Sequence, residues 1–237
     1  MRMNRKPVPK TGVSRRDALL ALGAALVAGP ASSQLAAPRP ACILTPEQME
    51  GPYFSDVRLD RSDIRGDPSD GSVKPGVPLA LSLRVLAVTP GNCAPLAGAV
   101  VDLWHCDASG AYSDATDSGF QTRGRKFLRG YQTTDAAGAV RFFTIYPGWY
   151  PGRAVHVHFK VRSDLLQGRE FSSQLYFPNA LTERVHARSP YERTRGRGTR
   201  NESDGLFRNG GTQLLLDPKP TSDGGYMASF DVGVALA

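Results

Sequence analysis

The sequence predicts an all-β fold, a β-sandwich of about eight short strands with long loops. Glycine and proline are frequent, 25 and 18 of 237 residues, which suits strands joined by turns better than helices. After the first 33 residues, no segment shows ten or more residues of helical periodicity. Hydrophobic residues make up 41% and charged residues 22% of the chain, an ordinary globular composition that excludes a disordered or membrane-embedded protein.

Eight segments carry strand patterns between turn signals. The predicted strands are residues 77–88, 97–105, the two arms of 128–148, 154–161, 172–177, 212–217 and 226–234. Asn92 to Pro95 is a predicted turn, and Asp135 to Gly138 joins the two arms of 128–148 with Gly138 in a left-handed position. Residues 178–211 are polar and rich in arginine, so we expect a long surface excursion there.

The first 33 residues are expected to be an export signal. They carry a net charge of +5, which leaves +2 of the formal +7 for residues 34–237, a length that suits one domain. Arg15 and Arg16 precede an apolar run, 18–29, that is shorter than the ~20 residues needed to span a bilayer. This pattern is typical of a cleaved twin-arginine signal and predicts export of a folded protein, to the periplasm. A short anchoring or core helix is the alternative.

The cysteines do not predict a zinc site, and the arginines do not predict binding to nucleic acid. Cys42, Cys93 and Cys106 match no zinc-binding spacing. In an oxidising compartment we expect one disulfide and one free thiol, and three pairings stay open. The arginine cluster at 184–200 is interleaved with acidic residues and has no aromatic ladder, so no nucleic-acid partner is expected.

Two histidines and two tyrosines are candidate metal ligands. His156 and His158 stand two apart in an alternating strand, so both side chains point to one face and can reach one ion. Two histidines on a solvated strand face are the alternative. Tyr150 lies six residues before His156 in a turn held by glycine and proline, and Tyr112 follows the strand that ends at His105.

The order of these motifs resembles that of the intradiol ring-cleavage dioxygenases, the family of catechol and protocatechuate dioxygenases. The matching segments are EGPYF (50–54), RSDIR (61–65), VVDLWHCDASGAYS (100–113), FLRGYQTTDAAGAVRFFTIYPGWYPGR (127–153), HVHF (156–159) and SSQLYF (172–177). The resemblance implies a β-sandwich with long active-site loops and Fe(III). It also implies that O2 cleaves a catechol-type ring between its two hydroxyl-bearing carbons, giving a cis,cis-muconate-type product.

The resemblance also implies roles for individual residues. Four residues fall on the iron ligands: Tyr112, Tyr150, His156 and His158. Tyr150 is then the ligand that substrate displaces and that takes up a substrate proton. Arg153 and Gln174 fall on the active-site arginine and glutamine, and Arg153 is expected to border the substrate. Tyr53 is expected to help form the wall of the substrate pocket, and a packing role is the alternative.

The residue types suit ferric iron. Two phenolates are hard anionic donors that favour Fe(III), whereas two histidines and a carboxylate would suit Fe(II). Metal charge deprotonates a tyrosine, whose free pKa is ~10. His105 and His186 are expected to be structural or solvated.

Two other interpretations stay open. One is a non-catalytic, exported, prealbumin-like β-sandwich that binds carbohydrate or protein, and the other is an enzyme with copper on the histidines. We expect no stable membrane association once the signal is removed. No residue in the sequence is predicted to bind a substrate carboxylate, so the identity of the catechol derivative stays open. Whether the protein forms a homo-oligomer stays open as well.

Overall fold

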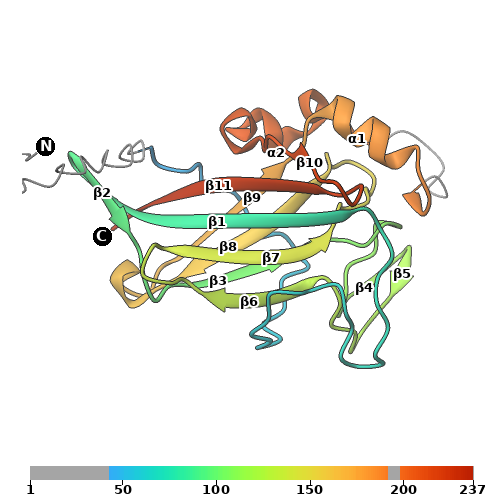
Figure 1. Cartoon of the computed structure of the whole chain (residues 1–237), viewed down its shortest axis with the longest axis horizontal. Coiled ribbons are helices and arrows are strands. Elements are labelled where there is room, and N and C mark those ends of the chain that lie inside the picture. The colour runs from blue at the N-terminus through green and yellow to red at the C-terminus, as the bar shows by residue number, and fades with distance from the viewer. Residues whose placement is uncertain (1–42, 192–197, 237) are drawn as a thin grey trace, which may run out of the picture. The chain divides into compact units, whose positions relative to one another are not determined.

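Two β-sheets pack against one another in a computed structural model that describes residues 43–191 and 198–236 (Figure 1). The first sheet contains β1 (Pro78–Thr89), β2 (Asn92–Pro95), β7 (Ala139–Ile145), β10 (Lys219–Pro220) and β11 (Tyr226–Ala235). The second contains β6 (Arg129–Thr133), β3 (Val100–Trp104), β8 (His156–Arg162) and β9 (Glu170–Tyr176), in that spatial order. A small hairpin contains β4 (Thr116–Asp117) and β5 (Phe120–Gln121). The predicted β-sandwich is confirmed.

The core lies between the two sheets because each sheet turns one apolar face inward. On β1, Leu79, Leu81 and Leu83 alternate with less buried residues, as a half-buried strand requires. β8 contributes Val157 and Phe159 to the same apolar cluster. Burying each such side chain stabilises the fold by about 1.5–3 kcal/mol. Strand alternation then places the even-numbered residues of β8 on the face away from this core.

The strand predictions differ from the structure in two places. The prediction for 212–217 is wrong: Gly211–Leu214 forms a short 3-10 helix, η4. Leu214 and Leu216 are buried, whereas Leu215 is 39% exposed. The contacts of this segment with a strand are an isolated parallel bridge from Leu215 to Tyr176 and the bond from Leu216 N to Tyr176 O, among the residues described. Asn92–Pro95, a predicted turn, is the short strand β2 paired with β1. The other seven predicted strands are present.

The prediction of a surface excursion at 178–211 is wrong in part. Its described residues include α1 (Asn179–His186), η3 (Asn201–Ser203) and α2 (Gly205–Arg208). Another short 3-10 helix, η1 (Asp164–Leu166), lies before this segment, between β8 and β9. Leu181 and Val185 of α1 are buried, since they stand four residues apart on one helix face. Asn201 and Asp204 are buried as well. A helix of eight residues is too short to show a periodic pattern against its polar surroundings.

The cysteines adopt two different states. Cys93 is disulfide-bonded and Cys106 is a free, buried thiol, which excludes the two pairings that involve Cys106. The predicted export signal, 1–33, lies outside the described residues. Within 43–191 and 198–236, no helix is both long and apolar enough to cross a bilayer.

Candidate metal centre

Two loops bring the candidate tyrosines together. Tyr112 follows a tight turn in which the Asp107 carboxylate accepts hydrogen bonds from the backbone N–H groups of Ser109, at 2.9 Å, and Ala111, at 3.1 Å. At Gly110 the backbone is left-handed, with φ of 90°, and a Cβ there would lie 2.3 Å from the carbonyl oxygen of Trp149. Glycine therefore allows the loop before Tyr112 to touch the loop that carries Tyr150.

Strand alternation brings the histidines to the same place. His156 and His158 lie on the face of β8 that points away from the sandwich core, and both side chains are buried. On the neighbouring strand β9, Tyr176 pairs with His156 and Gln174 pairs with His158. The predicted residues Gln174, His156 and His158 therefore share one region of the second sheet. Tyr176, which sequence analysis missed, joins them, and the alternation of SSQLYF was the signal for it.

Four polar atoms converge in this region. The Nε2 atoms of His156 and His158 are 2.9 Å apart, and the hydroxyl groups of Tyr150 and Tyr112 lie 3.2 Å and 3.4 Å from Nε2 of His156. The two hydroxyl groups are 3.5 Å from one another. Metal–nitrogen bonds of ~2.0–2.1 Å place neighbouring ligand atoms roughly 3 Å apart. The spacing therefore suits one metal ion bound by all four side chains.

The protonation of the histidines suits a cation. The Nδ1 of His156 donates a hydrogen bond to the Ala154 carbonyl at 2.6 Å, which leaves a lone pair on Nε2. Burial, and then the nearby Arg153 charge, lower the pKa of His156 to about 3. Burial, and then His156, lower the pKa of His158 well below its ordinary value. Both rings are therefore neutral at neutral pH and can act as ligands.

The tyrosines supply the charge that a trivalent ion needs. Burial raises the pKa values of Tyr112 and Tyr150, so both phenols stay protonated until a cation binds beside them. A bound metal ion reverses this effect and favours two phenolates. In the described part of the chain, no group of three or more His, Cys, Asp or Glu side chains is placed to hold a metal ion. The donor set of two phenols and two imidazoles fits Fe(III).

Arg153 and Gln174 lie together beside the centre. A guanidinium Nη2 of Arg153 donates to the Gln174 amide oxygen and also to the Tyr176 hydroxyl at 3.5 Å. The Nε of Arg153 donates to the Asp204 carboxylate at 3.0 Å. Burial opposes the charge of Arg153, yet Tyr150 and Asp204 raise its pKa overall, so it is a fixed cation. Asp204 was missed because it lies in a polar segment that gives no sequence signal for burial.

The segment around Tyr53 covers the centre. The Tyr53 ring stacks on Tyr112 with centroids 4.5 Å apart, and its hydroxyl donates to the Asp117 carboxylate at 2.5 Å. Burial raises the pKa of Tyr53 to about 12. Gly51 is left-handed, with φ of 80°, and a Cβ there would lie 3.2 Å from Cε1 of His158. Both the stacking and the close glycine place this segment directly over the candidate ligands.

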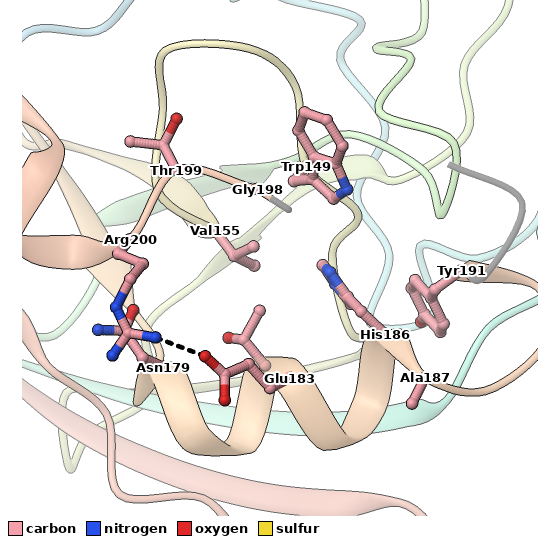
Figure 2. Close-up of a pocket in the computed structure, with 11 residues that line it drawn as sticks. Trp149, Val155, Asn179, Glu183, His186, Ala187, Tyr191, Gly198, Thr199 and Arg200 are labelled. Carbon is pink, nitrogen blue, oxygen red and sulfur yellow. Dashed lines mark hydrogen bonds and ion pairs between the residues drawn. The ribbon is translucent and has the colours of Figure 1, made fainter. Parts of the chain in front are cut away.

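Trp149 lines two cavities. One, of about 730 Å³, opens beside Tyr150 and is lined by Tyr53, Gly110, Phe120 and other residues of the two tyrosine loops. The other, of about 350 Å³, lies over α1 and has Trp149, Val155, His186 and the Glu183–Arg200 ion pair around it (Figure 2). The first cavity contains Tyr53 and Tyr150 of the predicted site, and the second contains none of the predicted site residues.

Two other histidines lie outside the centre, as expected. His105 is buried, with Nδ1 donating to the Cys106 carbonyl at 2.8 Å and Nε2 accepting from the Thr144 hydroxyl at 2.7 Å. The Nε2 of His186 donates to the Pro147 carbonyl at 3.0 Å, and its ring stacks on Tyr191. Hydrogen bonds to protein groups therefore hold both nitrogens of His105 and Nε2 of His186.

Solved structures similar to this chain include intradiol enzymes. The intradiol ring-cleavage dioxygenase from Tetranychus urticae is 31% identical, with a TM-score of 0.72 over 82% of this chain and 95% of that chain. The dioxygenase domain of a dioxygenase carbohydrate-binding protein fusion from Streptomyces sp. SirexAA-E is 32% identical. Its TM-score is 0.59, and the match covers 82% of this chain and 100% of that domain.

Curated proteins and a family model point the same way. The protocatechuate 3,4-dioxygenase beta chain of Burkholderia cepacia is 32% identical over 128 residues, 50% of this chain and 54% of that protein. Catechol 1,2-dioxygenase 1 of Acinetobacter lwoffii is 32% identical over 143 residues, 51% of this chain and 42% of that protein. The chain therefore spans about half the length of these curated relatives. A family model described as Dioxygenase matches residues 49–185. Together with the fold, these matches show that the chain belongs to the intradiol ring-cleavage dioxygenase family.

Proposed function

We propose that the protein is a non-haem Fe(III) dioxygenase that opens the ring of a catechol-type substrate between its two hydroxyl-bearing carbons. Both atoms of O2 enter the product, a cis,cis-muconate-type diacid. The observation that supports this most strongly is the convergence of two phenols and two imidazoles within 3.5 Å contacts, in a chain of the intradiol family.

Four side chains would hold the ion: Tyr112, Tyr150, His156 and His158. When bound, ferric iron supplies a Lewis acid that polarises both catechol oxygens and draws electron density from the ring. The two phenolates balance much of its charge, and the neutral imidazoles complete the set.

The two tyrosines have unequal surroundings. Tyr112 is 1% exposed and lies beneath the stacked ring of Tyr53. Tyr150 is only partly buried and lines the larger cavity. Tyr150 is therefore the side chain with room to move aside when substrate enters, and its phenolate oxygen can accept a proton from a substrate hydroxyl. Tyr112 stays in place with the histidines.

Arg153 supplies a fixed positive charge next to the reacting ring. Its guanidinium is hydrogen-bonded to Gln174, Tyr176 and Asp204, so its position is set before substrate binds. A preorganised cation stabilises negative charge that develops on the ring without the cost of reorienting water. Gln174 has its own anchor, because its amide donates to the Met49 carbonyl at 3.0 Å.

Oxygen uptake and product identification test this function. The iron-loaded full chain, mixed with catechol, protocatechuate, hydroxyquinol and chlorocatechols in turn, is expected to consume O2 and release the muconate-type diacid from at least one of them. With labelled O2, both oxygen atoms should appear in the product. A product opened outside the diol would contradict the intradiol position of cleavage. No O2 uptake with any catechol would contradict the proposal as a whole and favour a non-catalytic binding module.

We also propose that residues 1–33 direct export of the folded protein to the periplasm. The support is the pair Arg15 and Arg16 before the short apolar run. Replacing both arginines with lysine is expected to leave the full-length protein inside the cell. Unchanged export of that variant would show that the pair does not direct it.

A further inference from the structure

Asp204, from the C-terminal part of the chain, carries a buried carboxylate that bonds to Arg153 beside the candidate centre. It is 1% exposed, and both of its oxygen atoms accept hydrogen bonds. Oδ2 accepts from Nε of Arg153 at 3.0 Å and from the backbone N–H of Ala154 at 2.9 Å. Oδ1 accepts from the backbone N–H of Leu206 at 2.8 Å. The carboxylate thus joins a C-terminal segment to the residues that lead into β8.

These contacts constrain Arg153 at one end of its guanidinium. A long arginine side chain has many rotamers, and a carboxylate bonded to Nε selects those that aim the Nη atoms at a defined point. Here the Nη2 atom is directed at Gln174 and Tyr176, whose side chains stand beside His158 and His156 in the sheet register. The arginine is therefore held between Asp204 and the candidate metal centre.

The same carboxylate fixes the backbone beneath the arginine. Its bond to Ala154 N lies one residue after Arg153 and two residues before His156. The Ala154 carbonyl in turn accepts the Nδ1 hydrogen bond that orients the His156 ring. One buried group thereby anchors both the side chain of Arg153 and the start of the strand that bears the histidines.

We propose that Asp204 is a positioning residue for the ring-cleavage reaction, acting through Arg153. The inference rests on the proposed function, because it assigns Arg153 to charge stabilisation at the substrate ring. Without the carboxylate, the guanidinium keeps only its Nη2 bonds to Gln174 and Tyr176, so the charge is held less precisely where negative charge develops.

A double-mutant cycle in the iron-loaded full chain tests this. Asp204→Asn is expected to lower kcat by about 10²-fold, the scale of a ~1 Å misplacement, with a small change in KM. Arg153→Ala should lower kcat by at least as much. If Asp204 acts through the arginine, the double variant is no slower than Arg153→Ala alone. The visible iron absorption should persist in Asp204→Asn, since all four candidate ligands remain.

Asn201 supplies a matched control in the same segment. Its side-chain amide donates to the Phe177 carbonyl at 2.9 Å and has no hydrogen bond with Arg153 among the described residues. Asn201→Ala should lower the unfolding midpoint of the protein while kcat stays near that of the wild type. Asp204→Glu, which keeps the charge and moves it by one methylene, guards against a variant that fails to fold, and it should lose about tenfold in kcat.

The outcomes separate the two proposals. An active wild type with unchanged kcat in both Asp204 variants would overturn the positioning role alone. A further large loss when Asp204→Asn is added to Arg153→Ala would also overturn it, because the two residues would then act independently. A wild type that binds iron but consumes no O2 with any catechol would overturn the proposed function and this inference with it.

Discussion

Histidine is buried in two regions of this protein, and the regions differ in how the ring nitrogens are satisfied. His105 has a protein partner on each nitrogen, the Cys106 carbonyl and the Thr144 hydroxyl. At His156 and His158 the two Nε2 atoms instead face one another, 2.9 Å apart. Nδ1 of His158 has no hydrogen-bond partner among the residues that the structure describes.

Burial alone therefore does not distinguish the two regions. All three imidazoles are buried, and burial lowers the pKa of each. What differs is that His105 completes a hydrogen-bond network, whereas Nε2 of His156 faces Nε2 of His158 and both phenol hydroxyls. Incomplete satisfaction by protein groups is what sets the candidate metal centre apart from the surroundings of His105.

The largest expected effect is loss of the metal from His158→Ala. Removing one imidazole should abolish tight iron binding, and activity should fall by about 10³-fold or more, since a bound metal supplies several kcal/mol of transition-state stabilisation. Iron content and O2 uptake measure this. His105→Ala is the control, expected to retain iron while losing stability. If His158→Ala retained iron and His105→Ala lost it, the assignment of His158 as a ligand and His105 as a structural residue would be wrong.

The next effect is a loss of turnover in Tyr150→Phe. This variant keeps the ring but loses the hydroxyl that can accept a substrate proton, so kcat should fall by about 10²-fold. The visible absorption should also shift, because one phenolate no longer contributes to it. Tyr146→Phe is the matched control, since its hydroxyl bonds to Thr182 at 2.6 Å. If both variants changed the spectrum equally, Tyr150 would have no special place in the site.

Lowering the pH should reduce the free energy of unfolding through the buried, neutral His105. Burial lowers the pKa of His105 to about 4, against an ordinary value of 6.5. Because the folded pKa is lower, its contribution is fully present above pH 6.5 and is lost as pH falls from about 6.5 towards 4. At about 1.36 kcal/mol per pH unit, the loss is about 2 kcal/mol near pH 5. Urea unfolding of the wild type and of His105→Gln measures it, and equal pH slopes for the two proteins would refute it.

The smallest effect concerns the segment that covers the centre. Buried Lys160 pairs with Glu50, which belongs to that segment, and with Glu170 at 2.6 Å, which does not. Both glutamates are partly exposed, so each pair is worth under about 1 kcal/mol. Glu50→Gln should raise KM for catechol by a few-fold at most, through a looser Tyr53, and Glu170→Gln should not. If KM were the same in both variants, the Lys160–Glu50 ion pair would have no influence on substrate binding.

The order and spacing of the motifs, together with the family resemblance they carry, predicted the four candidate ligands. Strand patterns and turn residues predicted the fold class. The alternation around His156 and His158 depends only on local strand geometry, and the tyrosine turns lie next to strands in sequence. Arg153 and Gln174 were expected in the site as separate residues, and the structure adds that they bond to one another, with Gln174 on β9 and Arg153 in the turn before β8.

Other features depend on contacts between distant parts of the chain. Asp204 lies 51 residues from Arg153 in sequence, and nothing near it signals burial. Lys160 looked like one more strand residue, yet it is enclosed by two glutamates and the Phe54 ring. In 212–217, the apolar pattern suggested a strand, but tertiary packing forms a 3-10 helix to Leu214 and a single isolated bridge at Leu215.

The central claim is that two phenols and two imidazoles bind ferric iron, and the visible spectrum of the purified full chain tests it most directly. We expect stoichiometric iron and a burgundy to red colour from phenolate-to-iron charge transfer. A colourless protein that takes up no iron after ferric or ferrous loading would contradict the account.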